Sequence, residues 1–396
     1  MPSYNTSTTQ FAWRKEGDAA MTPVPLKLNN IQKQFGQAQV LRGVDLTLLP
    51  GEFLSLVGPS GCGKTTLARI LAGFMKPSFG RVLRSGRDIT GHPPGKRELR
   101  AVFSDTPLFP HRSILTNVTY GLKLQGLGRR ERRRQALHML ALTNLEDAAG
   151  KRPKALSPYQ YKMAVLARAL VLSPQVLMLD DPFVSLEEGE RRNILAFLKA
   201  LQQQWHFSVL YLTRDREEAM AVSHRMALML FGRVEQTGTP EEIYSRPESV
   251  AAARLMGPVN LLPGVVAARR SGGMIALDMD GLTLPAQTYG PPPAIGEDVL
   301  LCLRPEHLRL LDAPRPDSLI SGLFTSFRNE SGRRFHVVTL PTGREILCDD
   351  PQAKQLDPGS RVFLWWDAGK AALLSGEEEP LPMPGTPMDM GKGVPV

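Results

Sequence analysis

A glycine-rich segment constrains this chain more than any other part of its sequence. It reads GPSGCGKT, from Gly58 to Thr65, and lies between the apolar stretch FLSLV and the helical pattern TTLARILAGF. This matches G-x-x-x-x-G-K-[ST], in which glycines let the backbone wrap a phosphate without Cβ clashes. A chance match is the alternative, and the strand–loop–helix context argues against it. The sequence therefore predicts a phosphate-binding loop, with Lys64 reaching the β- and γ-phosphates and Thr65 giving its hydroxyl to Mg²⁺.

A second apolar stretch, VLMLDDP at 176–182, ends in two acidic residues. In nucleotide hydrolases with such a loop, a carboxylate at the end of a neighbouring strand holds the Mg²⁺, and Asp180 is the candidate. Asp181 follows at the carboxyl edge of the expected sheet, where a carboxylate can polarise an attacking water. The alternative is a pair of acids that merely ends a strand. The phosphate-binding loop favours the metal-binding interpretation.

The order of sequence patterns predicts two domains of different fold. Up to about residue 256, short apolar strands alternate with helical patterns, such as VLMLD before a helix near 189–204 and SVLYLT before EEAMAVSHRMALML. This alternation is typical of a parallel sheet covered by helices. From residue 257, short β-rich runs are separated by Gly, Pro and Asp, and RFHVVTL-PTG-REILC has the pattern of a hairpin. We expect the second domain to be a small β-barrel or sandwich.

Composition excludes several other classes of protein. No apolar run approaches the roughly 18 residues that a membrane-spanning helix needs, and residues 1–20 lack the pattern of a signal peptide. The three cysteines are far apart, which fits a reducing cytoplasm better than a disulfide framework. We expect residues 1–24 to be a disordered extension and residues 376–396 a disordered tail.

The net charge of +9 is compatible with nucleic acid, an anionic membrane surface or a phosphorylated ligand. The densest basic cluster is RRERRR, from Arg129 to Arg134. It is either a solvated helix face or a surface that contacts acidic lipid headgroups.

Together these segments resemble the ATP-binding subunit of an ABC transporter, of the importer type that serves maltose, spermidine/putrescine, ferric iron or phosphonate. The resemblance covers roughly residues 25–370. It is carried by LSPYQ at the signature position, FSDTPLFPHRSILTNVTYGL at the Q-loop, VLARAL, the switch segment YLTRDREEAM, and GRVEQTGTPEEIYSRP. LRPEHLRL, at 303–310, is similar to a recurring phrase of the C-terminal domain called TOBE.

The resemblance implies an α/β P-loop NTPase domain over 25–256, with a helical subdomain at about 105–172. An all-β, barrel-like TOBE/OB-like domain would follow over 257–375. Two such subunits would pair head to tail as a homodimer on the cytoplasmic face of the inner membrane, as peripheral proteins. Their partners would be membrane-spanning permease subunits and a periplasmic solute-binding protein, with no nucleic acid.

The resemblance also implies a set of ATP-binding residues. Phe35 would stack on adenine, although a buried core position is the alternative for this side chain. ATP would lie between the P-loop of one subunit and the signature helix of the other, to which Ser157 and Gln160 belong. The phosphate-binding residues are Gly58, Pro59, Ser60, Gly61, Cys62, Gly63, Lys64, Thr65 and Thr66.

Several positions depart from the family pattern where hydrolysis is carried out. Pro158 and Tyr159 replace the two glycines of LSGGQ, and proline lacks the N–H that relatives aim at the partner's γ-phosphate. Ser104 stands at the Q-loop glutamine, Asp181 at the catalytic glutamate and Arg214 at the switch histidine. An arginine stays protonated, so it cannot shuttle a proton, but it can bind a phosphate as a cation.

Two further departures follow the same pattern: Met163 replaces an arginine of the family, and the D-loop reads VSLE at 184–187. The sequence therefore predicts preserved ATP and Mg²⁺ binding with slowed hydrolysis. The competing hypotheses are a slow transport ATPase, a regulatory pseudo-ATPase, and a soluble protein acting on nucleic acid. A single P-loop and the transporter-type C-terminal domain argue against the third.

Overall fold

The computed structural model describes residues 25–279, 281–288, 291–314, 320–330, 332–353 and 356–375. The predicted extension and tail lie outside these residues. The chain divides into two compact units, Met1–Val234 and Glu235–Val396, and the division falls within β10 (Arg233–Gly238). The predicted domain boundary after residue 256 stays a prediction; the division places α7 (Pro240–Ser245) and α8 (Val250–Leu255) in the second unit.

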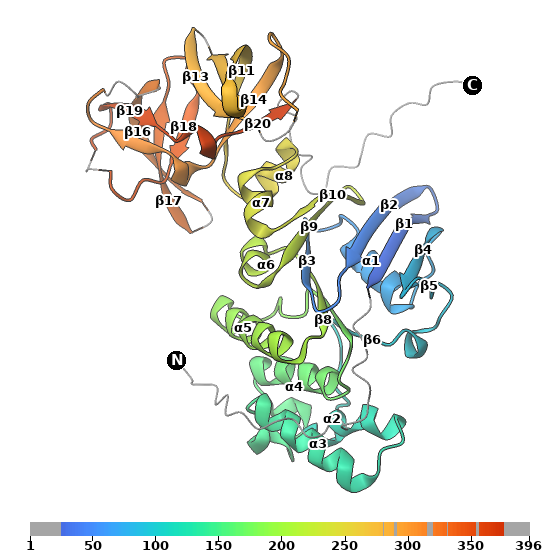
Figure 1. The fold of residues 1–396 in the computed structure, drawn as a ribbon. Helices are drawn as coiled ribbons and strands as arrows, with labels where there is room; N and C mark the ends of the chain where they lie inside the picture. Colours follow the sequence, from blue (N-terminus) through green and yellow to red (C-terminus); the bar gives the residue numbers. More distant parts are fainter. Residues whose placement is uncertain are drawn as a thin grey trace. The chain divides into compact units, whose positions relative to one another are not determined.

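A parallel sheet forms the centre of the first unit (Figure 1). Its strands lie in the order β9 (Arg225–Leu230), β3 (Phe53–Val57), β8 (Ser208–Thr213), β7 (Val176–Asp180) and β6 (Leu99–Phe103). Successive side chains of a strand point to opposite faces, and both faces of this sheet are buried. In β8, for example, Val209 and Tyr211 pack into one core cluster, whereas Leu210 and Leu212 pack into the other.

Different elements cover the two faces of this sheet. The helix after the P-loop, α1 (Lys64–Ala72), packs on one face with a four-stranded antiparallel sheet in the order β2-β1-β4-β5. The strands of that sheet are β1 (Leu26–Phe35), β2 (Ala38–Leu48), β4 (Phe79–Arg84) and β5 (Arg87–Asp88). The core on the other face includes residues of α2 (Ile114–Leu124), α3 (Arg129–Leu142), α4 (Pro158–Leu170), α5 (Glu188–Trp205) and α6 (Arg216–Val222).

The segment EEAMAVSHRMALML corrects one expectation. It was predicted to be helical throughout, but α6 ends at Val222 and β9 begins at Arg225. His224 Nδ1 accepts a hydrogen bond from the Phe53 amide at 2.9 Å, and the His224 amide donates to the Phe53 carbonyl at 2.8 Å. These bonds turn the chain into a strand beside β3, where an apolar run is buried on both faces. A short apolar run fits either a buried strand or a helix, so periodicity alone could not decide.

The second unit has two five-stranded antiparallel sheets that share one apolar core. The first has the order β13 (Leu282–Gln287), β12 (Met274–Met279), β11 (Asn260–Arg269), β14 (Asp298–Leu303) and β20 (Ala372–Ser375). The second has the order β15 (Arg309–Leu311), β19 (Arg361–Trp365), β16 (Ile320–Glu330), β17 (Arg333–Thr339) and β18 (Glu345–Cys348). This all-antiparallel architecture confirms the expected barrel-like β domain, and the predicted hairpin is the β17–β18 pair.

Among the described residues, no helix is both long and apolar enough to cross a membrane. The three cysteines are free and buried. Trp366 is part of the core of the second unit.

Candidate nucleotide-binding site

The P-loop connects β3 to α1 with a backbone that only glycine adopts easily. Gly63, at the N-cap of α1, has a φ of 108°, and a Cβ on Gly58 would lie 2.3 Å from the Met229 carbonyl oxygen. No side chain caps α1 and its first turn holds no acidic residue, so its amides remain available to an anion. Lys64 is buried, and its Nζ donates to the carbonyl oxygens of Gly58 at 2.7 Å and Pro59 at 3.0 Å.

Asp180 ends β7 as a buried carboxylate beside the P-loop. Burial raises the pKa of Asp180, and a hydrogen bond from the Thr65 hydroxyl opposes that rise. Its Oδ1 atom is buried and has no hydrogen-bond partner in the described part of the chain. A buried, unsatisfied carboxylate oxygen next to a hydroxyl is what a Mg²⁺ site requires before the metal binds, because Mg²⁺ takes oxygen ligands. The residues present therefore fit Mg²⁺.

Asp181 and Arg214 face each other at the carboxyl edge of the sheet. Arg214 Nε lies 3.9 Å from Asp181 Oδ2, and Arg214 Nη1 donates to Ser60 Oγ at 3.1 Å. Asp181 has a φ of 42°, and its amide donates to the Leu212 carbonyl at 2.9 Å. Arg214 therefore bridges the P-loop and the acidic end of β7, two segments that are far apart in the sequence.

Ser104 follows β6, and the β6–β7 register pairs Phe103 with Asp180, so Ser104 lies at the same sheet edge as Asp181. Sequence reasoning missed the residues that hold this segment. Lys162 Nζ donates to the Ser104 carbonyl at 2.8 Å, and the Leu108 amide donates to the Tyr161 hydroxyl at 2.9 Å. These contacts tie α4 to the segment after β6, and no local sequence signal marks a contact across 58 residues.

The start of α4 has the local structure that its sequence predicts. Ser157 Oγ accepts from the Gln160 amide, Gln160 Oε1 accepts from the Ser157 amide, and Pro158 occupies the first turn. Tyr159 packs partly against the core, and Met163 is buried in it. Within the described part of the chain, neither Ser157 nor Gln160 forms a hydrogen bond or an ion pair with the P-loop.

Phe35, at the end of β1, is 46% exposed, which argues against the alternative of a buried core position. Lys33 Nζ lies 5.0 Å from the centroid of its ring. An exposed aromatic face is available for stacking on a base.

A cavity of about 370 Å³ lies beside Asp181 and Arg214. Five further polar residues line it, none of which was predicted as a site residue from the sequence: Arg191, Tyr211, Thr213, Asp215 and Glu218. They come from α5, from β8 and from the start of α6, so the chain brings them together only through its fold.

Known proteins match both units of the chain. The family model for ABC transporters matches residues 41–184, and the model for the TOBE domain matches residues 301–374. The spermidine/putrescine import ATP-binding protein PotA of Marinobacter nauticus is 37% identical over 90% of this chain and 97% of its own length. Its counterpart in Rubrobacter xylanophilus is 35% identical over 95% of this chain and 100% of its own length.

Among solved structures, a dimeric bacterial ABC transporter cassette is 28% identical, with a TM-score of 0.50. The match covers 54% of this chain and 98% of that one. The likeness supports the ABC ATPase fold for the part of the chain that it covers. The chain belongs to the ATP-binding subunits of ABC transporters, of the importer type with a C-terminal TOBE domain.

Proposed function

We propose that this subunit binds ATP and Mg²⁺ and hydrolyses ATP slowly at the interface of a head-to-tail homodimer. The observation that carries the proposal is the buried carboxylate of Asp180, whose unpartnered oxygen lies beside the Thr65 hydroxyl and the P-loop. A site in this condition is suited to a hard cation accompanied by phosphates.

Each residue near the P-loop has a role that its position supports. Lys64 donates to two carbonyl oxygens of the loop in this structure. When ATP binds, its ammonium group leaves these carbonyls and binds the β- and γ-phosphates. Thr65 and Asp180 hold Mg²⁺, which neutralises charge on the phosphates when it is bound. The exposed ring of Phe35 stacks on adenine. Backbone amides between Ser60 and Thr66 surround the phosphates, and the Cys62 side chain is buried.

Asp181 and Arg214 divide the work that relatives give to a glutamate and a histidine. Asp181 accepts a hydrogen bond from the attacking water and orients it, and Arg214 binds the γ-phosphate as a fixed cation. The hydrogen bond from Arg214 to Ser60 of the P-loop supports this role for the guanidinium. Ser104 lies at the same edge but has a shorter side chain than the family's glutamine, so the water is held by fewer groups.

The second half of each ATP site comes from the partner subunit. Ser157 and Gln160 lie at the exposed start of α4, available to the partner's ATP. Pro158 provides no amide hydrogen there. Lost contacts of this kind reduce the rate more than the affinity where they act mainly in the transition state.

The relatives named above are importer subunits for spermidine and putrescine, and we extend that class of small organic cation to this chain. Membrane permease subunits, a periplasmic solute-binding protein and a peripheral position on the cytoplasmic face of the inner membrane complete the proposal. We also propose that the ATPase domain ends, and the TOBE domain begins, after residue 256.

The test is ATP hydrolysis by the purified subunit assembled with its membrane partners. The wild type should hydrolyse ATP above the rate of a Lys64→Ala variant, with dependence on Mg²⁺ that an Asp180→Asn variant loses. Equal rates for the wild type and Lys64→Ala would refute hydrolysis. ATP binding that survived in that case would leave a regulatory ATP-binding subunit instead.

A further inference from the structure

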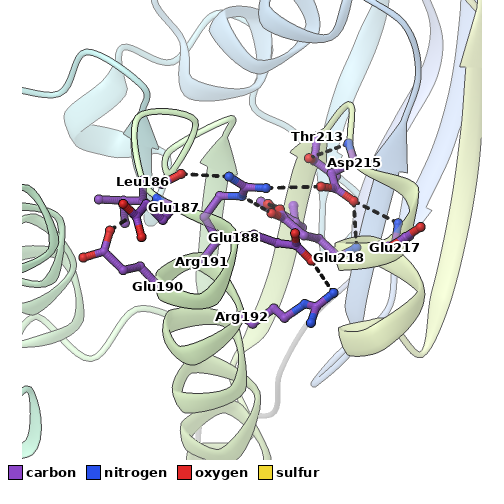
Figure 2. Close-up of polar contacts among 11 residues, drawn as sticks. Leu186, Glu187, Glu188, Glu190, Arg191, Arg192, Thr213, Asp215, Glu217 and Glu218 are labelled. Carbon is purple, nitrogen blue, oxygen red and sulfur yellow. Dashed lines mark hydrogen bonds and ion pairs between the residues drawn. The ribbon is translucent and has the colours of Figure 1, made fainter. Parts of the chain in front are cut away.

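Arg191, on α5, joins two loops that carry the reacting residues (Figure 2). Its Nη1 donates to the Leu186 carbonyl at 2.8 Å, within the D-loop that follows Asp181. Its Nε donates to Glu218 Oε1, and its Nη2 lies 3.6 Å from Asp215 Oδ2. One guanidinium therefore contacts the segment after β7 and the segment after β8 at the same time.

The acceptors of Arg191 are themselves held in place. Glu218 is buried, and its second oxygen accepts from the Tyr211 hydroxyl at 2.5 Å. Asp215 is the N-cap of α6, where its Oδ1 accepts from the amides of Glu217 and Glu218 at 3.0 Å each. A charged group with several fixed partners in a partly dry site holds one geometry, because each displaced hydrogen bond would leave a buried polar atom unpaired.

The positions of these contacts connect them to the reaction. Asp215 is the residue directly after Arg214, and Leu186 is five residues after Asp181. Asp181, Arg214, Arg191 and Glu218 line the same cavity of about 370 Å³. Asp181 and Arg214 approach each other to 3.9 Å, and the guanidinium of Arg191 joins the same two loops through Leu186 on one and Asp215 and Glu218 on the other.

We propose that Arg191 is a positioning residue: by tying the D-loop to the start of α6, it sets where Asp181 stands relative to Arg214 when ATP is hydrolysed. The effect on hydrolysis rests on the proposed function. The contacts of Arg191 with the two loops do not, because they form without nucleotide. Lysine cannot replace this arginine, since an ammonium keeps the charge but lacks the planar group that donates in three directions.

The adjacent residue offers a matched control. Arg192 is on the same helix and also forms an ion pair, with Glu188 one turn earlier. Its side chain is 67% exposed, whereas that of Arg191 is 23% exposed. Arg192→Ala removes the same kind of residue and a surface pair of little energetic weight, while it leaves both loops untouched.

The first measurement uses hydrogen–deuterium exchange of the full chain without nucleotide, for the wild type, Arg191→Lys, Arg191→Ala and Arg192→Ala. We expect faster exchange in both 183–187 and 213–218 in the two Arg191 variants, and wild-type exchange in Arg192→Ala. Unchanged exchange in either segment of Arg191→Ala would overturn the proposed tie. This outcome does not depend on hydrolysis, so it separates the proposal from the proposed function.

The second measurement is steady-state ATP hydrolysis by the assembled transporter. We expect kcat to fall by about 10- to 100-fold in Arg191→Lys with KM within about twofold, since a displacement near 1 Å of a reacting group has about that effect. A merely structural role would instead give a folded Arg191→Lys variant with wild-type kcat, and that result would overturn the positioning role. If the wild type itself does not exceed Lys64→Ala, the proposed function fails while the exchange result still decides the tie.

Discussion

Replacing Asp181 by Glu and Arg214 by His, singly and together, tests whether these two residues act as one matched pair. Arg214 Nε lies 3.9 Å from Asp181 Oδ2. A glutamate at 181 adds one methylene and brings its carboxylate into closer contact with the guanidinium, which withdraws it from the water. A histidine at 214 is shorter and loses the hydrogen bond to Ser60. We therefore expect each single variant to be slower than the wild type, and the double variant to recover part of the loss.

The expected size follows from the geometry of the pair. Two unit charges about 4 Å apart attract by about 1 kcal/mol in water and by about 4 kcal/mol at an effective dielectric constant of 20. The side chain of Arg214 is 50% exposed and that of Asp181 is 27% exposed, so the interaction lies towards the lower limit. About 1–2 kcal/mol corresponds to a five- to thirty-fold change in rate. We expect Arg214→His, which removes the permanent positive charge of the pair, to lower kcat by that factor, with a coupling energy of about 1 kcal/mol.

The assay measures kcat and KM for ATP in the assembled transporter for the wild type, both single variants and the double variant. Lys64→Ala supplies the background rate. ΔΔG‡ from the four rates gives the coupling energy directly. Additive effects, within about 0.5 kcal/mol, would refute the matched pair. A large gain in either single variant would show instead that the family's chemistry had been weakened without compensation.

Three further predictions concern stability. Because burial raises the pKa of Asp180, its charged form opposes folding at pH 7, and that penalty fades as pH falls through the raised pKa. In urea without Mg²⁺ or nucleotide, Asp180→Asn should therefore have a larger free energy of unfolding than the wild type at pH 7. This difference should narrow as the pH falls towards the ordinary Asp pKa of about 3.9. An equal or larger difference at low pH would contradict this cause. Ser157→Ala removes the cap of α4 and should lower the free energy of unfolding by about 1 kcal/mol, and a neutral result would show that packing alone fixes this helix start. Trp366→Ala should cost about 3–5 kcal/mol in an unfolding transition of the second unit, since its side chain lies in the core; a loss below 1 kcal/mol would mean that the core closes around the gap.

The parts of the site that the sequence predicts are those that depend on nearby residues. The P-loop needs glycines, a lysine and a hydroxyl within a few positions, and the capping box of α4 needs only Ser157 and Gln160. Such patterns determine local geometry with little help from the rest of the fold. The strand–helix alternation predicts the parallel sheet for the same reason, because each strand is buried on both faces and reads as a short apolar run.

The contacts around the candidate site that join distant segments could not be predicted in this way. Arg191 and Glu218 are 27 residues apart, and Lys162 reaches a carbonyl 58 residues earlier. A carbonyl acceptor leaves no trace in a single sequence, since every residue has one. Arginines on a helix that begins EGERRNI predict solvated charge, and only the fold shows that Arg191 turns inward while Arg192 stays exposed.

The start of α4 shows that helix stability and catalytic function can make opposite demands on the same residues. Proline in the first turn has a suitable φ and gives up an amide that the helix itself does not use, so Pro158 favours the helix. Tyr159 adds contact with the core. By the resemblance to ABC transporters, the amides at this point would face another subunit's ATP, and the amides of a first turn have no acceptor within the helix itself. The residues at 158 and 159 therefore fit the local fold of α4, and under the proposed function they alter only the surface that this helix presents to the partner subunit's ATP.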